Sequence, residues 1–264
     1  MLVAAAFGFM VGYQTQSPML GFIAGAGAGM LMATLFSWLA LVLATNQVAT
    51  GLALSIFGTG LSAFMAQRFV GFAMPAQAKA VPGLADLPFV GPAFFQHHWM
   101  VYFSLLLCFA IMWFLFRTRA GLTLRAIGES PESAHALGYP VRRIRLAAVV
   151  AGGALCGLAG AYVSVAYTPL WVEGMIAGKG WIALALTTFA TWRPARVLLG
   201  AYLFGGVTML QFHLQSLGVN VPTQFLSMLP YLATIVVLVL ISRNPLWIRV
   251  NMPSSIGKPF YPGA

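Results

Sequence analysis

The stretch Trp99-Met-Val-Tyr-Phe-Ser-Leu-Leu-Leu-Cys-Phe-Ala-Ile-Met-Trp-Phe-Leu-Phe116 contains no charged side chain. A helix that crosses the hydrocarbon core of a bilayer needs about 20 consecutive, mostly apolar residues. Residues 99–116 therefore predict a transmembrane helix, and the fold depends on how many more such segments the chain holds.

The composition of the whole chain is that of a membrane protein. Of the 264 residues, 60% are hydrophobic and only 7% are charged, whereas a soluble domain carries roughly 25% charged residues. The 14 basic and 4 acidic side chains are too few to cover a water-facing surface. An ordinary soluble globular protein is thereby excluded.

Apolar segments recur along the chain at lengths suited to helices. They lie at 1–13, 18–43, 46–66, 99–116, 146–167, 175–191, 197–214 and 223–242. The first is short for a full span, and only Ala44 and Thr45 separate the second from the third. We expect an all-α fold, a polytopic transmembrane bundle of about eight spans in one domain over residues 1–264.

The cationic side chains divide unevenly between the two ends of these spans. One end carries Arg117, Arg119, Arg125, Arg142, Arg143, Arg145, Arg193, Arg196, Arg243, Arg249 and Lys258, and the other carries Arg68, Lys79 and Lys179. Because Lys and Arg collect in cytoplasmic loops, we expect loop 117–145 and both termini in the cytoplasm and the proline-rich loop 67–98 outside. This bias also explains the net charge of +10 without a nucleic-acid partner.

Two sets of polar or small residues suggest how the helices meet. Gly21, Gly25 and Gly29 recur at four-residue spacing, as do Gly153 and Gly157, and such rows let helix backbones approach closely, either within the bundle or at a dimer seam. In segment 46–66, Ser55, Thr59 and Ser62 share one helical face. This face either lines a solvated lumen or bonds back to the preceding turn of its own helix.

The spans lack the groups that chemistry would require. The four acids Asp86, Glu129, Glu132 and Glu173 all lie in loops or at segment ends, and no His, Cys or carboxylate cluster has metal-ligand spacing. No nucleophile–base pair and no Walker-type phosphate loop is present. We expect a non-enzyme with no metal and no cofactor of its own, so that free energy for uphill transport must come from another polypeptide.

Loop 117–145 carries the sharpest local signal. Ser130 is a good N-cap, Pro131 suits the first helical position, Glu132 complements the helix dipole and Gly138 suits a left-handed C-terminal position. These residues predict a helix of under two turns over 131–137. A helix this short needs a packing partner, unless the segment is only a surface turn.

The same residues carry a resemblance to a known family. Arg125-Ala-Ile-Gly-Glu-Ser-Pro-Glu-Ser-Ala134, followed by Gly138, resembles the cytoplasmic coupling loop of ATP-binding-cassette importer permeases serving ribose, branched-chain amino acids and nucleosides. The nucleoside-type permeases that work with basic-membrane-protein lipoproteins are similar in several further stretches. These are Asn46-Gln-Val48 with Gly51-Leu-Ala-Leu54, Tyr167-Thr-Pro-Leu-Trp-Val-Glu-Gly-Met175, Gly178-Lys-Gly-Trp-Ile-Ala183, Trp192-Arg-Pro194, Leu203-Phe-Gly-Gly206 and Leu229-Pro-Tyr-Leu232.

The resemblance implies a multi-pass subunit of the bacterial plasma membrane with several partners. Two ATPase subunits would bind ATP and dock below, a second permease subunit would complete the pore, and a periplasmic or lipoprotein receptor would dock above. The residues implied in coupling to the ATPase are Glu129, Ser130, Pro131, Glu132, Ala134, Leu137 and Gly138. Members of the family usually begin with a further span ending in an Asn-x-Gly…Glu-Gly stretch, which these 264 residues do not contain. Either such a span precedes residue 1 in the full protein, or the protein is naturally short.

The resemblance further implies a translocation pathway. The candidates for its lining are Asn46, Gln47, Ser55, Phe57, Thr59, Tyr167 and Trp181, although each aromatic side chain also suits interfacial anchoring or core packing. Glu173 either docks the receptor or pairs locally with Lys179.

Other functions remain open on the sequence alone. A channel or facilitator accounts for the apolar spans but gives no use to the capped helix 131–137. An intramembrane enzyme lacks its catalytic cluster. Importers of sugars or branched-chain amino acids would share the architecture and differ only in ligand, and residues 167–183 favour nucleosides or purines.

Overall fold

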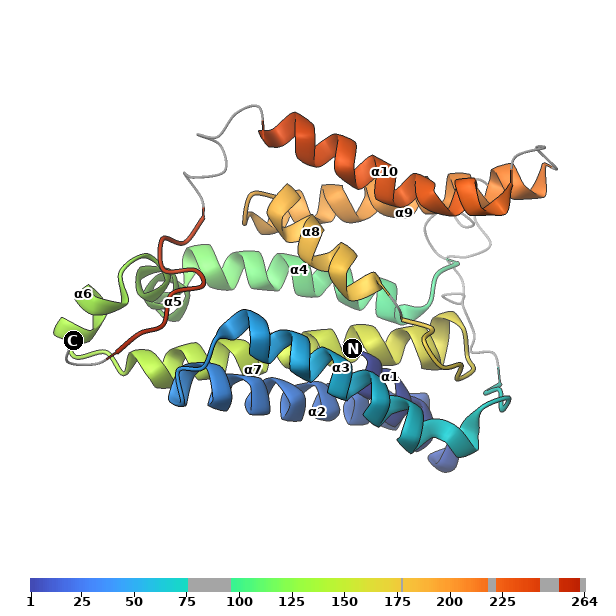
Figure 1. Cartoon of the computed structure of the whole chain (residues 1–264), viewed down its shortest axis with the longest axis horizontal. Helices are drawn as coiled ribbons and strands as arrows, with labels where there is room; N and C mark the ends of the chain where they lie inside the picture. Colours follow the sequence, from blue (N-terminus) through green and yellow to red (C-terminus); the bar gives the residue numbers. More distant parts are fainter. Residues whose placement is uncertain (76–95, 177, 218–221, 243–251, 262–264) are drawn as a thin grey trace.

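The computed structural model of the chain describes residues 1–75, 96–176, 178–217, 222–242 and 252–261 (Figure 1). Ten α-helices lie in these ranges. They are α1 (Leu2–Thr15), α2 (Pro18–Ser37), α3 (Gln47–Ala66), α4 (Trp99–Arg117), α5 (Arg119–Glu129), α6 (Pro131–Ala136), α7 (Val141–Tyr162), α8 (Lys179–Phe189), α9 (Pro194–Ser216) and α10 (Thr223–Ser242). One helix lies in each of the eight apolar segments, which confirms the expected all-α helical bundle.

Two of the long helices continue as π-helical turns. Trp38–Val42 extends α2 and Val163–Tyr167 extends α7. With these extensions, five helices among the described residues are long and apolar enough to cross a membrane: Pro18–Val42, Gln47–Phe69, Trp99–Arg117, Val141–Tyr167 and Pro194–Ser216. Large apolar side chains such as Phe64, Leu106 and Leu199 are exposed on their outer faces, as a lipid-facing surface requires.

The long helices run back and forth between two ends of the molecule (Figure 1). From α2 to α4 and from α7 to α10, successive long helices reverse direction, so α4 ends and α7 begins where α5 and α6 project. The turn between α8 and α9, with Arg193 and Arg196, lies at this same end. The arginine-rich loops are thus gathered at one end of the bundle, as the charge pattern predicts.

The first residue does not lie at the arginine-rich end. Helix α1 has 14 residues, which is about 21 Å of helix at 1.5 Å per residue and less than the hydrocarbon thickness of about 30 Å. Met1 consequently lies inside the bundle, where its carbonyl packs against Gly160 of α7. The expectation that both termini lie in the cytoplasm stays a prediction.

The glycine rows hold α2 against α7. A side chain at Gly29 would overlap the Gly153 carbonyl and lie 2.7 Å from the Cα of Gly157, and one at Gly157 would overlap the Gly25 carbonyl. These positions must lack a side chain because the two backbones are in contact. The structure confirms the packing interpretation of these rows within one chain.

The end of the bundle opposite α5 and α6 is closed by irregular backbone. Isolated β-bridges join Val70 to Trp171 and Ala73 to Leu170, and the Met74 amide donates to the Pro169 carbonyl at 2.8 Å. Trp171 is fully buried in the core cluster that also contains Phe9. This agrees with an irregular cap over the described parts of loop 67–98, while residues 76–95 lie outside the described residues.

Candidate functional site

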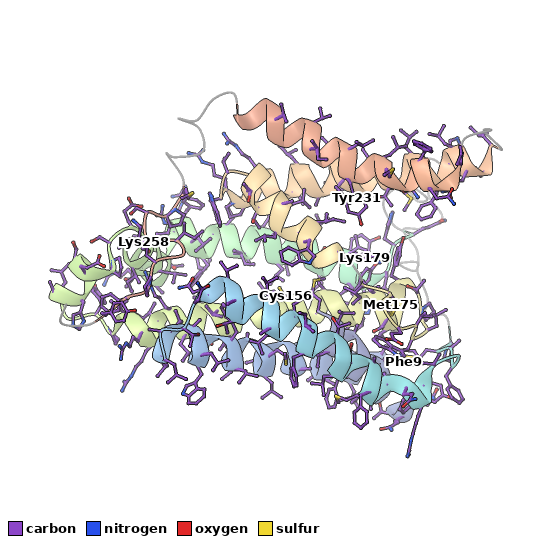
Figure 2. All side chains as sticks on the ribbon, in the orientation of Figure 1. Phe9, Cys156, Met175, Lys179, Tyr231 and Lys258 are labelled. Carbon is purple, nitrogen blue, oxygen red and sulfur yellow. The ribbon has the colours of Figure 1, made fainter. Side chains whose placement is uncertain are left out.

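A cavity of about 700 Å³ lies in the middle of the bundle. It is open on part of its surface and is bordered by α1, α2, α3 and α7 on one side and by the segment from Ile176 to Thr187, including α8, on the other. Its wall is mainly small or apolar, and Cys156 of α7 marks its position in Figure 2. Ligand cavities commonly have volumes of about 300–1,000 Å³ and mostly apolar walls, so this space is of the right size and character for a small solute.

Two of the seven predicted pathway residues line this cavity. They are Ser55 of α3 and Trp181 of α8. The lining does not include Asn46, Gln47, Phe57, Thr59 or Tyr167. The structure therefore brings together a part of the predicted set, from two helices far apart in the sequence.

The hydroxyl groups of α3 show why Ser55 and Thr59 differ. The Thr59 hydroxyl donates to the Ser55 carbonyl at 2.9 Å, and the Ser62 hydroxyl donates to the Thr59 carbonyl at 2.8 Å. Both are thus satisfied by their own helix, as one of the two interpretations of this face predicts. The Ser55 hydroxyl forms no hydrogen bond within the described residues and faces the cavity.

The other pathway candidates have local roles. The Asn46 side chain caps α3, accepting from the amides of Val48 and Ala49 at 3.0 and 3.1 Å. Gln47 is the first residue of this helix, and Phe57 is 52% exposed. Tyr167 lies beneath the Lys179 ammonium, which is 5.8 Å from its ring centroid.

The cavity also has lining residues that the sequence analysis did not single out for this role. Gly29, Gly152, Gly153, Cys156 and Thr187 all line it. The glycine rows on α2 and α7 predict close helix packing. Because glycine has no side chain, the same positions also leave space for the cavity. A polar-residue search alone could not find them.

The segment between α4 and α7 is more helical than expected. Thr118 caps α5 by accepting from the Gly121 amide at 3.1 Å. Gly121 packs so closely on the Phe114 carbonyl that a side chain there would overlap it, which fixes the corner between α4 and α5. The expectation of a loop over 117–145 with one short helix missed α5, although Thr118 is a residue type that commonly caps helices.

The predicted short helix is present at residues 131–136. Ser130 caps it by accepting from the Ser133 amide at 3.3 Å, Pro131 is its first residue, and Gly138 follows it with φ of +86°. Helix α6 projects beyond the ends of the spans (Figure 1). The local capping analysis is thus confirmed.

The side chains of α6 and its flanks divide into an inner and an outer set. Glu129, Glu132 and Leu137 are exposed, with Leu137 at 78%. Ala134 is only 5% exposed, because it packs in a cluster with Ile127, Val141 and Phe260. Ala134, one of the residues implied in coupling to the ATPase, is therefore covered by its own chain in this structure, and Leu137 presents the exposed apolar surface.

Glu173 is exposed at the capped end of the bundle. Among the described residues it forms no ion pair with Lys179, whose ammonium instead faces the Tyr167 ring. Of the two expectations for Glu173, the local pair is not formed in this structure.

A bundle of apolar helices with a central cavity and a short capped helix projecting at one end has the architecture of a membrane transport protein. Residues 1–241 match the family described as "Branched-chain amino acid transport system / permease component". The chain belongs to this family.

Curated relatives carry names of the same class. TsgC13 of Haloferax volcanii, which is provisionally named as a glucose ABC transporter permease protein, is 40% identical over 97% of this chain and 85% of its own length. The nucleoside ABC transporter permease protein NupC of Lactococcus lactis is 32% identical over 86% and 74%, and the guanosine ABC transporter permease protein NupQ of Bacillus subtilis is 30% identical over 94% and 79%. No solved structure matches the chain. The protein is a permease subunit of an ATP-binding-cassette (ABC) transporter.

Proposed function

We propose that this chain forms part of the translocation pathway of an importer for a nucleoside or a simple sugar, and that α6 couples the pathway to a separate ATPase. The observation that carries the proposal is the combination of a central cavity with a capped, projecting α6 in one chain. The names of relatives that carry glucose, nucleosides or guanosine support these two substrate classes.

The chemistry of α6 supports the proposed coupling role. Its outer surface combines the Glu132 carboxylate with the exposed Leu137 side chain, which suits a groove with basic and apolar groups. A six-residue helix would not be stable alone in water, so its order depends on what packs against it. ATP would be bound by the partner ATPase, and this chain would need no cofactor.

The cavity suits a solute with both an apolar face and polar edges. Trp181 is 60% exposed and presents a broad aromatic surface, and the Ser55 hydroxyl is available for hydrogen bonding. Stacking on an aromatic side chain contributes about 1–3 kcal/mol per base in nucleic-acid complexes. A nucleobase meets this arrangement better than a small amino acid does.

The exposed surfaces of the bundle are consistent with two further partners. A second permease subunit would complete the pathway by packing on the exposed apolar helices. A substrate-binding receptor would dock at the capped end, where Glu173 is exposed and without an ion pair among the described residues. A facilitator that works alone would leave α6 without a role.

The experiment that tests coupling uses the chain reconstituted in proteoliposomes with its cassette ATPase and receptor. Glu132→Arg reverses the outer charge of α6, and Gly138→Pro cannot adopt the φ of +86° or make the hydrogen bond from the Gly138 amide to the His135 carbonyl. Both variants should abolish stimulated ATP hydrolysis and uptake of radiolabelled guanosine or glucose. Glu132→Asp keeps the carboxylate and is the matched control. Wild-type stimulation in both variants, with normal insertion, would exclude the coupling role.

A further inference from the structure

The segment from Pro253 to Phe260, which we call the tail clasp, packs on the α5–α6 element. It lies beyond residues 1–241, the part of the chain that matches the family. In Figure 1 the red trace of this segment passes beside α5 and reaches α6. A segment beyond the residues that match the family thus touches the element that we propose as the coupling site.

Hydrogen bonds fasten the clasp to the end of α5. The Ser255 amide and hydroxyl both donate to the Gly128 carbonyl, and the Ser254 hydroxyl donates to the Glu129 carbonyl. The last carbonyls of a helix have no partner within the helix. The tail therefore supplies the C-terminal cap that α5 cannot supply from its own sequence.

An apolar contact fastens the clasp beneath α6. Phe260 is only 9% exposed and packs with Ile127 of α5, Ala134 of α6 and Val141 of α7. The ring of His135, also on α6, meets Phe260 edge-on at a centroid distance of 5.6 Å. Phe260 is thus the side chain at which the three helices of this end converge.

Arg145 of α7 connects the two attachments. Its guanidinium donates to the Ser255 hydroxyl at 2.9 Å and lies 6.0 Å from the Phe260 ring centroid. Helix α7 is also the helix that forms the glycine contacts with α2 and lines the cavity. The clasp therefore ties α6 to the span whose wall borders the cavity.

We infer that the tail clasp holds α6 at a fixed angle to α7, and that Ser255 and Phe260 are positioning residues for coupling between the ATPase and the cavity. This inference rests on the proposed coupling role of α6. Helix α6 has too few residues to be stable by itself, and its buried side is the Ala134 contact with this cluster. Losing the clasp should leave the spans folded and let α6 open locally.

The test uses Phe260→Ala and Ser255→Ala in the assembled transporter. Hydrogen exchange of residues 131–137 should accelerate about tenfold or more in Phe260→Ala, because a buried aromatic contact is lost. Stimulated ATP hydrolysis and uptake should fall together, while the amount of protein in the membrane stays unchanged. Ser255→Thr keeps the donor and should restore coupling. Tyr261→Ala removes the neighbouring aromatic side chain, which is exposed, and should have no effect.

The outcomes separate this inference from the proposed function. If Glu132→Arg abolishes stimulation while Phe260→Ala and Ser255→Ala leave it at the wild-type level, the clasp inference is wrong and the coupling role of α6 stands. Faster exchange in α6 with wild-type stimulation overturns it as well. If Glu132→Arg itself has no effect, the coupling role fails first.

Discussion

Two neighbouring glycines of α7 face opposite environments. A side chain at Gly153 would overlap Ala33 and lie 2.7 Å from the Gly29 carbonyl oxygen, whereas a side chain at Gly152 would meet nothing within 4 Å. Both glycines line the cavity, but only Gly153 also forms the contact with α2. The comparison shows that α7 has a packed side, which fixes the bundle, and an open side, which leaves room for a solute.

The difference between the packed side and the open side of α7 explains how the bundle can be stable and still contain a cavity. Backbone contact between α2 and α7 gives close van der Waals packing that long side chains would prevent. Helices α3 and α8 do not approach α7 in the same way, and the cavity lies between them. A solute can therefore be accommodated without loosening the α2–α7 contact.

The largest effect is expected where the packed side is broken. In Gly153→Leu the new side chain has no space, because the opposing groups are the Gly29 backbone and the Ala33 Cβ. Overpacking of a core costs about 1–3 kcal/mol and more where backbone must move. The folded protein recovered after detergent extraction should fall several-fold, as measured by size-exclusion chromatography and thermal unfolding.

Gly27→Leu is the control for this prediction. Gly27 also lies on α2, but a side chain there would meet nothing within 4 Å. Its recovery should match that of the wild type. Equal recovery of Gly153→Leu and Gly27→Leu would contradict the close contact between α2 and α7.

Gly152→Leu should separate transport from folding. The side chain enters open space, and replacing glycine within a helix favours the helix by up to about 1 kcal/mol. The protein should therefore extract and unfold like the wild type, while the leucine occupies part of the cavity and lowers uptake by about tenfold or more. Normal uptake in this variant would show that the solute passes elsewhere.

The sequence predicts where the helices lie better than it predicts which face of each helix packs and which face is open. The apolar segments predict eight of the helices, and the capping residues predict α6. These predictions succeed because segment length, hydropathy and capping depend only on residues close together in the sequence. Helix α5 was missed because its residues are charged and amphipathic, and its corner depends on the contact of Gly121 with Phe114.

The cavity could be predicted only in part for a similar reason. Ser55 and Thr59 are equivalent by helical spacing, but only the structure shows that Thr59 bonds to its own helix and Ser55 faces the cavity. The contribution of Trp181 depends on the approach of α8 to α3 across the bundle. No local sequence pattern predicts which distant helix completes the wall of the cavity.

Trp181→Ala tests the aromatic part of the open side. Loss of one stacking partner costs about 1–3 kcal/mol for a base, which is roughly 5-fold to 150-fold in apparent affinity. The concentration of guanosine needed for half-maximal uptake should rise within this range. Trp113→Ala removes an equally exposed indole from α4 that does not line the cavity, and uptake should not change. An equal effect of both variants would indicate a general loss of aromatic anchoring.

The smallest effect is expected for two hydroxyls that sequence spacing cannot tell apart. Ser55→Ala removes a hydroxyl that faces the cavity and has no partner within the described residues. One hydrogen bond to a solute contributes about 0.5–1.5 kcal/mol, so half-maximal uptake should require roughly 2-fold to 12-fold more substrate. Thr59→Ala removes a hydroxyl that already donates to the Ser55 carbonyl, and uptake kinetics should stay at the wild-type level. The reverse order of these two effects would mean that the solute contacts the Thr59 hydroxyl rather than the Ser55 hydroxyl, and would contradict the proposed role of Ser55.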